Sequence, residues 1–543
     1  MTKVKGWYIP GNEPPTSGRA SVVRAVQTLH EDFAVVEWDG QPAVLTGGSY
    51  VCQQDAPAAN ALPVLAFVPS LLPGDLGHRS FQNTYGVRAN YVAGAMANGI
   101  GSEEVVIAMA NAGMMGFFGA AGLPTSRIEQ AILKIQTEVG DLPYGVNLIH
   151  SPQDSRQEQE TVDLLLKYEV RNVSASAFMK LTAPIVQFRV CGLYRDASGE
   201  IRSRNHIMAK VSREEVAEPF LRPAPEKFLT LLLKEGRITQ EQAQWAAQIP
   251  MADDITAEAD SGGHTDRQAA PVLLPLLCGL RDRIATELGI AHRVRVGSAG
   301  GISTPQAAAA AFSMGADYVL TGSINQACVE AGTSDMVKAM LAEAGMADVD
   351  MAPAGDMFEH GAEVQVLKRG TLFAMRGRHL YELYRQYDRI EDIPADILQK
   401  LEAQVFRQSI DEVWSACERF FAERDPAQIE RAAAQPRHKM ALIFRWYLGR
   451  SSRWAITGDP ARKMDTQIWC GPGIGSFNAW TKGSFLEDPA QRSVAIVAIN
   501  IMAGAASVAR AQHLLQQGVD AGSETQTWIP RTLANPKLST VTQ

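Results

Sequence analysis

Apolar and polar positions follow two alternating patterns between residues 90 and 325. Short apolar runs of strand length are separated by segments of about 10–15 residues with apolar side chains at helical spacing. The strand-length runs are 91–97, 115–120, 144–149, 172–177, 206–211, 255–260, 294–300 and 318–323. Eight strands, each followed by a crossover, are typical of a (β/α)8 barrel, so we predict an α/β fold of this TIM-barrel type. An open doubly wound sheet is the alternative.

The rest of the chain shows other patterns. Residues 33–38 and 63–69 are strand-like pieces between glycine and proline turns, and they predict a small, partly β N-terminal lobe. The strand pattern stops after about residue 345, and 376–450 repeats apolar residues at helical spacing, which predicts an appended helical subdomain. We therefore expect an N-terminal lobe (1–85), a barrel (86–345), a helical insertion (346–465) and a C-terminal segment that packs back on the barrel (466–543).

Composition narrows the class of protein. The 543 residues are 46% hydrophobic and 20% charged, which is typical of a globular protein with a sizeable core. The net charge of −8 argues against nucleic acid or an anionic membrane as the main partner. The six cysteines form no CxxC pair, so neither a disulfide framework nor a zinc site is expected.

The termini and the longest apolar segment bear on location and assembly. The first residues contain no apolar signal segment, and we expect a cytoplasmic protein. The apolar stretch 494–509 is interrupted by Asn500 and Ser507, and we interpret it as a buried helix rather than a membrane span. This helix could also support a homodimer.

Two glycine-rich segments end consecutive predicted strands. GSAGGIST (297–304) ends with Gly300 and Gly301 in its turn, and VLTGSIN (319–325) has Gly322 and Ser323 at the corresponding place. In a barrel these loops are neighbours at the C-terminal rim, where glycine lets backbone N–H groups approach an anion. Two such turns in consecutive units favour a phosphate site over ordinary tight turns.

A histidine follows the sixth predicted strand in EADSGGHTD (258–266). His264 comes directly after Gly262 and Gly263, so its imidazole is expected over the barrel mouth, where it could donate a proton or hold a carbonyl. A purely structural histidine is the alternative. The acidic residues nearby suggest a metal site, but no second histidine lies close in the sequence, so we predict no metal.

Small residues at other strand ends leave a flat ligand space. Ala95, Met96 and Ala97 offer backbone groups and Asn147 offers an amide, a combination that suits a planar heterocycle. Lys210 could place a cation beside such a ring, or it could simply pair with an acidic neighbour. The segment GPGIG (471–475) lacks the strand that a dinucleotide loop needs, and we interpret it as a turn between helices.

A basic stretch interrupts the acidic chain. Residues 431–463 contain eight Lys or Arg side chains and one acid, together with four aromatic residues. Such a surface could dock an acidic partner, although it could equally be a helix with solvated charges and buried aromatics, and nucleic acid is a weaker interpretation. The residues that we assign to a partner are Arg437, Lys439, Arg445, Arg450 and Arg453.

The motifs together resemble a known family. MANGI, GVNLI, the SGGH loop, SAGGI and TGS occur in the order found in the flavin-binding barrel of nitronate monooxygenases and of flavin-type enoyl reductases. Residues 352–384 and 471–487 resemble the PfaD family of trans-acting enoyl reductases of polyunsaturated fatty acid and polyketide synthases. The resemblance covers about residues 40 to 515. The His264 loop departs from the family, because EADSGGH has one residue added between the strand and the glycines where flavin reductases often show EAGGH.

The resemblance implies an FMN cofactor, NADPH as hydride donor, and an acyl-carrier-protein-bound enoyl thioester as substrate. His264 occupies the position of the active-site histidine, as proton donor or carbonyl anchor. The residues expected to contact the cofactor are Ala95, Met96, Ala97, Asn98, Asn147, Lys210, Gly262, Gly263, Ser298, Gly300, Gly301, Gly322 and Ser323. A nitronate monooxygenase, a non-catalytic synthase scaffold and a metal-dependent lyase or aldolase barrel are the alternatives.

Overall fold

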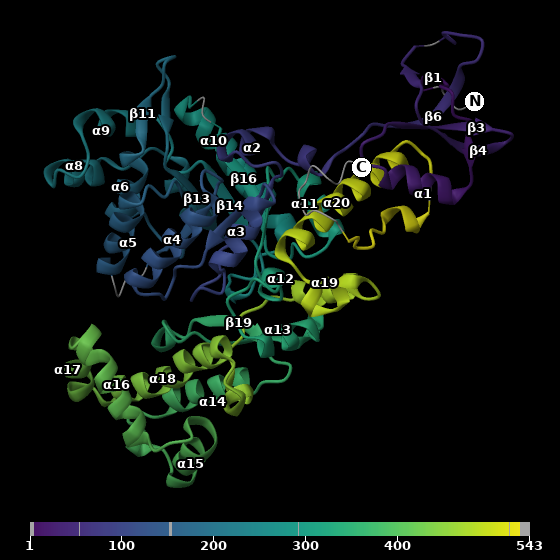
Figure 1. Cartoon of the computed structure of the whole chain (residues 1–543). Helices are drawn as coiled ribbons and strands as arrows, with labels where there is room; N and C mark the ends of the chain where they lie inside the picture. Colours follow the sequence, from purple (N-terminus) through teal and green to yellow (C-terminus); the bar gives the residue numbers. More distant parts are fainter. Residues whose placement is uncertain (1–4, 54, 151–154, 291–292, 521, 533–543) are drawn as a thin grey trace.

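The computed structural model describes residues 5–53, 55–150, 155–290, 293–520 and 522–532. Eight parallel strands close into a barrel, which confirms the predicted (β/α)8 fold (Figure 1). The barrel strands are β7 (Tyr91–Ala93), β8 (Met115–Phe118), β9 (Gly145–Ile149), β10 (Asn172–Ser176), β13 (His206–Val211), β14 (Asp254–Glu258), β16 (Arg295–Ala299) and β17 (Val319–Thr321).

Most of these strands are shorter than the apolar runs that predicted them. The first run, 91–97, is a strand only to Ala93, because the chain turns at the rim, where the Gly101 N–H donates to the Met96 carbonyl at 2.9 Å. The residues at the ends of the runs therefore form loops at the carboxyl ends of the strands. In a barrel, those loops build the ligand site.

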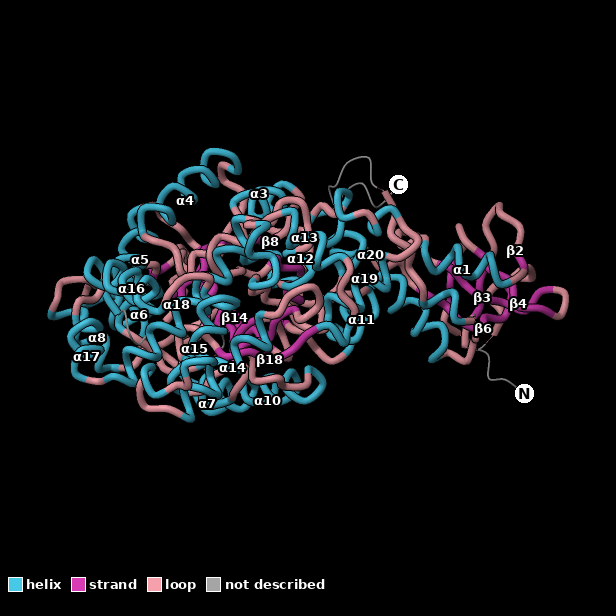
Figure 2. Tube along the Cα trace, turned by 90° about the horizontal axis from the view of Figure 1, so that it is seen from below, coloured by secondary structure: helices cyan, strands magenta, loops and turns pink. Residues whose placement is uncertain are grey.

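Helices surround the barrel, as Figure 2 shows for the tube turned by 90°. They are α3 (Glu103–Asn111), α4 (Thr125–Val139), α5 (Ser155–Lys167), α6 (Ala183–Cys191), α7 (Glu214–Leu221), α10 (Ala270–Leu288), α11 (Pro305–Ser313) and the short α12 (Ser323–Gln326), with α8 (Glu226–Lys234), α9 (Gln240–Ala246) and the hairpin β11 (Leu193–Arg195) and β12 (Ile201–Ser203) inserted. Side-chain caps fix two of their starts: Ser102 Oγ accepts from the Val105 N–H, and Thr304 Oγ1 accepts from the Ala307 N–H.

Side chains alternate between the inside and the outside of the barrel. In β13, Met208 belongs to the cluster inside the barrel, whereas Ile207 and Ala209 pack against the surrounding helices. Helix α2 (Arg79–Tyr85) closes the bottom of the barrel with Phe81 and Tyr85, which are fully or nearly fully buried. Although we predicted α2 within the N-terminal lobe, it packs with the barrel.

The N-terminal lobe is a six-stranded sheet with one helix, and it projects from one side of the barrel (Figure 1). Its sheet order is β2 (Thr16–Ser17), β4 (Gln41–Leu45), β3 (Phe33–Trp38), β6 (Leu62–Val68), β1 (Trp7–Ile9) and β5 (Ser49–Val51), with α1 (Arg19–Gln27) against it. The two predicted strands correspond to β3 and β6.

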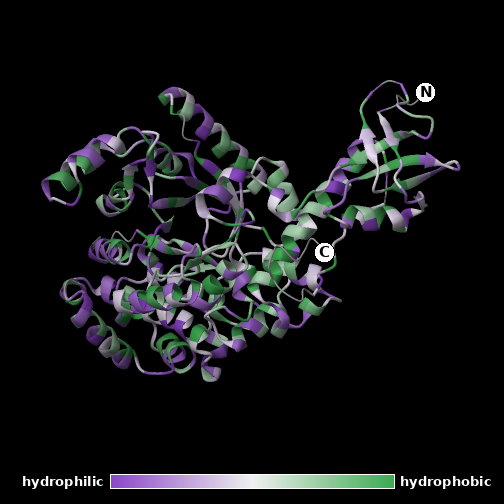
Figure 3. Cartoon of the chain, turned by 45° about the horizontal axis from the view of Figure 1, so that its top comes forward, coloured by the Kyte–Doolittle hydropathy of each residue, from purple (hydrophilic) through white to green (hydrophobic). Residues whose placement is uncertain are grey.

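Helix α20 (Val494–Gln516) joins the lobe to the barrel, and it is largely apolar (Figure 3). It contacts α11, α3 and α1, and the buried Arg510 donates to the Leu29 and Ala25 carbonyls of the lobe. Among the described residues, α20 is the one helix long and apolar enough to cross a membrane, but 89% of its most apolar window is buried inside the protein. The expected buried helix is confirmed, and α20 has no free apolar face for the homodimer suggested above.

The appended subdomain is not purely helical. Strands β18 (Val349–Pro353) and β19 (Glu363–Leu367) form a three-stranded sheet with β15 (Gly263–His264) from the barrel rim. The prediction that strands stop after residue 345 is therefore wrong. The helices follow as α14 (Phe373–Gln386), α15 (Ala395–Lys400), α16 (Ile410–Arg424), α17 (Ala427–Ala434) and α18 (Pro436–Thr457), with α13 (Asp335–Ala342) before the sheet and α19 (Gly473–Thr481) after α18.

Candidate active site

The two glycine loops lie side by side at the carboxyl end of the barrel, because β16 and β17 are paired neighbours. Gly300 and Gly301 have φ of 82° and 72°, a backbone conformation that glycine adopts without strain. A Cβ on Gly300 would lie 2.6 Å from the Ala259 carbonyl carbon, so this glycine serves close packing. A Cβ on Gly301 or Gly322 would meet no atom within 4 Å. We call the two glycine loops, 300–301 and 322–323, the glycine cradle. It has open space beside Gly301 and Gly322.

The C-terminal segment closes over this cradle. A Cβ on Gly473, at the start of α19, would lie 3.6 Å from the Gly301 Cα. The Ser476 and Ser303 hydroxyls lie 2.7 Å apart, and the Gly471 N–H donates to Ser323 Oγ at 3.0 Å. GPGIG therefore begins a helix against the cradle and is not the turn between helices that we predicted. The glycines of this segment could be recognised in the sequence, but the sequence did not show that the fold places them against the loops after β16 and β17.

This arrangement fits the phosphate of a flavin nucleotide. Backbone N–H groups at Gly301, Gly322 and Ser323 border the open space, and the Ser323 hydroxyl can still donate while it accepts from Gly471. Ser298 does not fit the same role. Ala299 faces the barrel interior and Val296 faces the helices, so Ser298, two residues from Val296, points its buried side chain outward. A contact of Ser298 with the cofactor would therefore come from its backbone, and its assignment to the cofactor site stays a prediction.

The mouth of the barrel is its opening at the carboxyl ends of the strands. The floor of this mouth is formed by the β7–α3 loop and the inward side chains of β9 and β13. Ala95, Met96, Ala97 and Asn98 are half-buried in this loop, and Asn98 has a φ of 58°. Asn147 donates both amide hydrogens, to the Ser174 carbonyl at 2.9 Å and to Ser176 Oγ at 3.1 Å. These donors are satisfied within the protein, so the Asn147 oxygen is the atom left for a ligand.

Lys210 and Glu258 form an ion pair at the inner end of the mouth. Their Nζ and Oε1 atoms lie 2.7 Å apart, and both side chains lie on the inward faces of β13 and β14. The alternative that Lys210 pairs with an acidic neighbour is therefore the one the structure favours.

His264 lies on β15, above the mouth. Its Nε2 lies 3.2 Å from Asp356 Oδ2, and the two side chains are 48% and 61% exposed. The hydrogen bond to Asp356 raises the pKa of His264 above its ordinary value, and it outweighs partial burial, which lowers it. A Cβ on Gly262 would lie 2.6 Å from the Cys470 Cα. Gly262 is therefore needed for packing against Cys470, and its contact with a cofactor stays a prediction.

Gly263, the residue before His264 in the same loop, is less closely packed than Gly262. Gly263 has a φ of 80°, and a Cβ there would lie 3.9 Å from Trp469, so one side of this residue stays open. No group of three or more His, Cys, Asp or Glu side chains suited to a metal ion occurs among the described residues.

The basic stretch divides into cations that have a partner within the protein and cations that have none among the described residues. Arg445 donates from Nε to the Gly355 carbonyl at 2.8 Å, Arg437 pairs with Asp388, and the Lys439 ammonium lies over the Trp414 ring. Within the described part of the chain, Arg450 and Arg453 are exposed and have no ion-pair partner.

The aromatic residues of this stretch mostly face the core. Phe444, Tyr447 and Trp454 are buried. The interpretation of a surface studded with aromatics is therefore wrong, and Arg450 and Arg453 are the cations left to meet a partner.

Two family models match the chain. The nitronate monooxygenase model matches residues 87–373, which is more than half of the chain. The model of the inserted helical domain of [acyl-carrier-protein] S-malonyltransferase matches residues 387–466, which include α15 to α18.

Several known proteins are similar over most of the chain. One of the subunits of a polyunsaturated fatty acid synthase from Thraustochytrium sp. is 50% identical over 76% of this chain, and polyketide biosynthesis protein PksE from Bacillus subtilis is 47% identical over 77%. The matches cover 28% and 54% of those relatives, so the chain spans about a quarter and about half of their lengths.

A solved structure matches both in sequence and in shape. The enoyl reductase domain of MlnA, from the macrolactin biosynthesis cluster of Bacillus amyloliquefaciens, is 40% identical with a TM-score of 0.78. The match covers 82% of this chain and 99% of that domain. The similarity therefore includes the appended subdomain as well as the barrel.

Proposed function

The chain belongs to the nitronate monooxygenase family, and we propose that it is a flavin-dependent enoyl reductase acting on thioesters bound to an acyl carrier protein. The observation that carries this proposal is the match to nearly the whole MlnA enoyl reductase domain, at 40% identity and with a TM-score of 0.78. The names of the two synthase relatives point to polyketide or polyunsaturated fatty acid synthesis as the setting.

Family membership implies a flavin, and we propose that it is FMN. Gly301, Gly322 and Ser323 would hold its phosphate, with Gly471 and Gly473 closing the cradle from the C-terminal segment. The β7–α3 loop and the Asn147 oxygen would border the ring. When bound, the flavin supplies the hydride for the substrate double bond, and we propose NADPH as the source of that hydride.

The protein contributes proton transfer and orientation. Reduction of an α,β-unsaturated thioester places negative charge on the thioester oxygen, and a proton must reach the α-carbon. His264 lies above the mouth with Nδ1 free of any hydrogen-bond partner among the described residues. This nitrogen can therefore hold the proton that the substrate needs.

A carrier protein is the partner that the charge pattern supports. Carrier proteins are acidic, so the exposed cations Arg450 and Arg453 on α18, which pair with no described residue, suit such a surface. The segment that carries them is similar to a helical domain of a transferase that acts on an acyl carrier protein. We propose that the carrier docks on this part of α18.

The absorption spectrum of the purified protein tests the proposal. We expect the two bands of an oxidised flavin, bleached by NADPH under anaerobic conditions and restored by crotonyl-CoA. Protein that stays colourless after incubation with FMN would overturn the proposal. A bleached spectrum that oxygen and a nitronate restore, but an enoyl thioester does not, would instead assign a nitronate monooxygenase.

A further inference from the structure

The appended subdomain reaches into the candidate active site through one loop. This loop connects β18 to β19 and carries Asp356, whose Oδ2 lies 3.2 Å from His264 Nε2. The contact crosses from the barrel rim to the subdomain. The backbones around it are tied as well, because His264 pairs with Val364 of β19 in the small sheet.

The Asp356 loop is fixed on both sides of the carboxylate. On one side, Arg445 of α18 donates to the Gly355 carbonyl at 2.8 Å. On the other side, the Phe358 side chain is fully buried, with its ring 5.2 Å from the Tyr384 ring. Although the Asp356 side chain is exposed, its backbone is held by a polar anchor and by the core of the subdomain.

The His264 loop is fixed from the same side. Gln365 of β19 donates from Nε2 to Asp260 Oδ1 and to the Ser261 carbonyl, both at 2.9 Å. Gly262 packs against the backbone of Cys470. Both partners of the His264–Asp356 contact therefore belong to anchored backbone, which favours a defined geometry over a chance surface contact.

Among the described residues, two charged groups raise the pKa of His264. Asp356 contributes most to the raised pKa of His264, and Glu258 adds a smaller effect. Glu258 is already paired with Lys210. Burial would raise the pKa of Asp356, but the hydrogen bond and the charge of His264, together with backbone N–H groups, outweigh burial, so that the pKa of Asp356 is lowered. Both shifts favour an imidazolium beside a carboxylate.

We propose that Asp356 is the positioning residue of His264: it accepts the Nε2 hydrogen, fixes the ring, and leaves the Nδ1 hydrogen to be donated to the substrate. This inference rests on the proposed enoyl reduction. The hydride, which comes from a reduced nicotinamide nucleotide, forms the new C–H bond at the β-carbon and places the electron pair of the double bond on the enolate. The Nδ1 proton then forms the C–H bond at the α-carbon, and the neutral imidazole takes a proton from water.

The test compares Asp356→Asn and Asp356→Glu with the control Asp350→Asn. Asp350 lies on the same hairpin but pairs with Arg378 at 2.8 Å. The first readout is the NMR titration of isotopically labelled histidines, with His264 assigned from its absence in His264→Gln. We expect Asp356→Asn to lower the pKa of His264, Asp356→Glu to restore it largely, and Asp350→Asn to leave it unchanged.

The second readout is the rate at which crotonyl-CoA reoxidises the reduced enzyme, measured against pH. A proton donor is lost as the pH rises through its pKa, so lowering that pKa moves the descending limb to lower pH. Asp356→Asn should therefore match wild type at low pH and be slower at high pH, with the rate of reduction by NADPH unchanged.

The outcomes separate this inference from the proposed function. An unchanged pKa of His264 in Asp356→Asn overturns the inference, whatever the enzyme does with an enoyl thioester. So does an unchanged pH profile in an enzyme whose wild type reduces crotonyl-CoA. A wild type that binds flavin but never reduces an enoyl thioester overturns the proposed function instead, and with it the catalytic part of the inference.

Discussion

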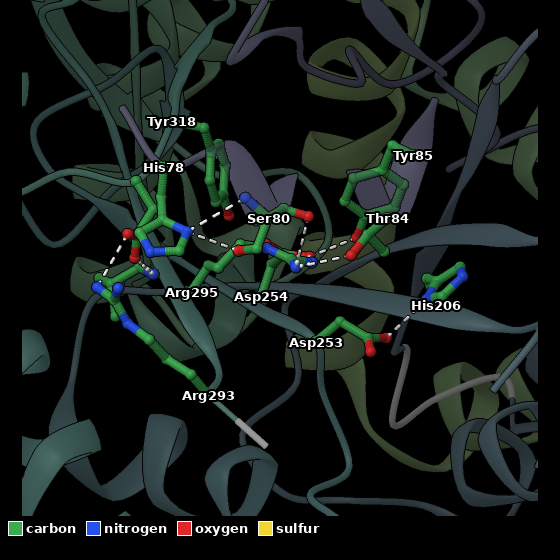
Figure 4. A network of polar contacts seen from close by, with 12 residues as sticks. His78, Ser80, Thr84, Tyr85, His206, Asp253, Asp254, Arg293, Arg295 and Tyr318 are labelled. Atoms are coloured by element: carbon green, nitrogen blue, oxygen red, sulfur yellow. Dashed lines mark hydrogen bonds and ion pairs between the residues drawn. The ribbon is translucent and has the colours of Figure 1, made fainter. Parts of the chain in front are cut away.

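The ion pair at the bottom of the barrel gives a quantitative prediction for Asp254→Asn. Asp254 is fully buried, and its two carboxylate oxygens accept from Arg295 Nε at 2.7 Å and Nη2 at 2.8 Å (Figure 4). The Tyr85 hydroxyl donates to the same carboxylate. The asparagine amide would turn a donor toward the guanidinium and leave a buried positive charge without its counter-ion.

The magnitude follows from the burial of the pair. Removing one partner of a buried ion pair costs about 3–5 kcal/mol, whereas an exposed pair contributes about 0–1 kcal/mol. At roughly 2 °C per kcal/mol for a barrel of about 250 residues, Asp254→Asn should lower the unfolding temperature of the barrel by about 6–10 °C. Glu287→Gln is the matched control, because Glu287 also forms two hydrogen bonds with an arginine, Arg222, but is 52% exposed.

Differential scanning calorimetry of the two variants side by side measures the difference. The network lies at the end of the barrel opposite the glycine cradle, so folded Asp254→Asn should bind as much flavin per molecule as wild type. The double variant Asp254→Leu/Arg295→Met should be less destabilised than Asp254→Asn, since it leaves no unpaired charge. If Asp254→Asn unfolds within the range of Glu287→Gln, the reasoning from burial is refuted.

Three further predictions concern the site. His264→Ala should keep its flavin and lose about 10²–10⁴-fold in turnover with an enoyl thioester, and full activity would remove His264 from the mechanism. Gly322 has no left-handed φ and has open space beside it, so calorimetry should show that Gly322→Leu is folded. Titration with FMN should show that its affinity for FMN is lower than that of wild type by about 100-fold or more. An unchanged affinity would place the phosphate elsewhere. Arg450→Glu/Arg453→Glu should raise the KM for a carrier-bound substrate roughly 10-fold at low salt and spare crotonyl-CoA; equal KM values for wild type and variant would reject the dock.

The barrel could be predicted because its signals are local. Each strand is a short apolar run, and each crossover repeats at helical spacing, so both can be read within a window of the sequence. The strand ends were predicted too long where small residues follow, as at Ala95 and Ala97. Small apolar side chains suit a strand and a rim loop equally, and what ends β7 is a hydrogen bond between Gly101 and Met96.

The small sheet over the mouth could not be predicted, because its pairing is not local. β15 has two residues, too few to show any alternation, and its partner β19 follows about a hundred residues later. The contact between His264 and Asp356 depends on that pairing. A lone aspartate in a loop carries no signal of its own, so sequence reasoning found the histidine and missed the carboxylate beside it.

Arg445 shows how the structure changes the meaning of a charge pattern. Counted in the sequence, it is one of eight cations in a basic stretch, and a charge reversal there would be expected to affect carrier docking alone. In the fold it bonds to Gly355, next to the residue that contacts His264. Reversing Arg445 would therefore disturb the reaction with a small thioester as well. Because Arg450 and Arg453 lie on the same helix and have no ion-pair partner in the part of the chain that the structure describes, they separate docking from proton transfer, which a variant at Arg445 cannot do.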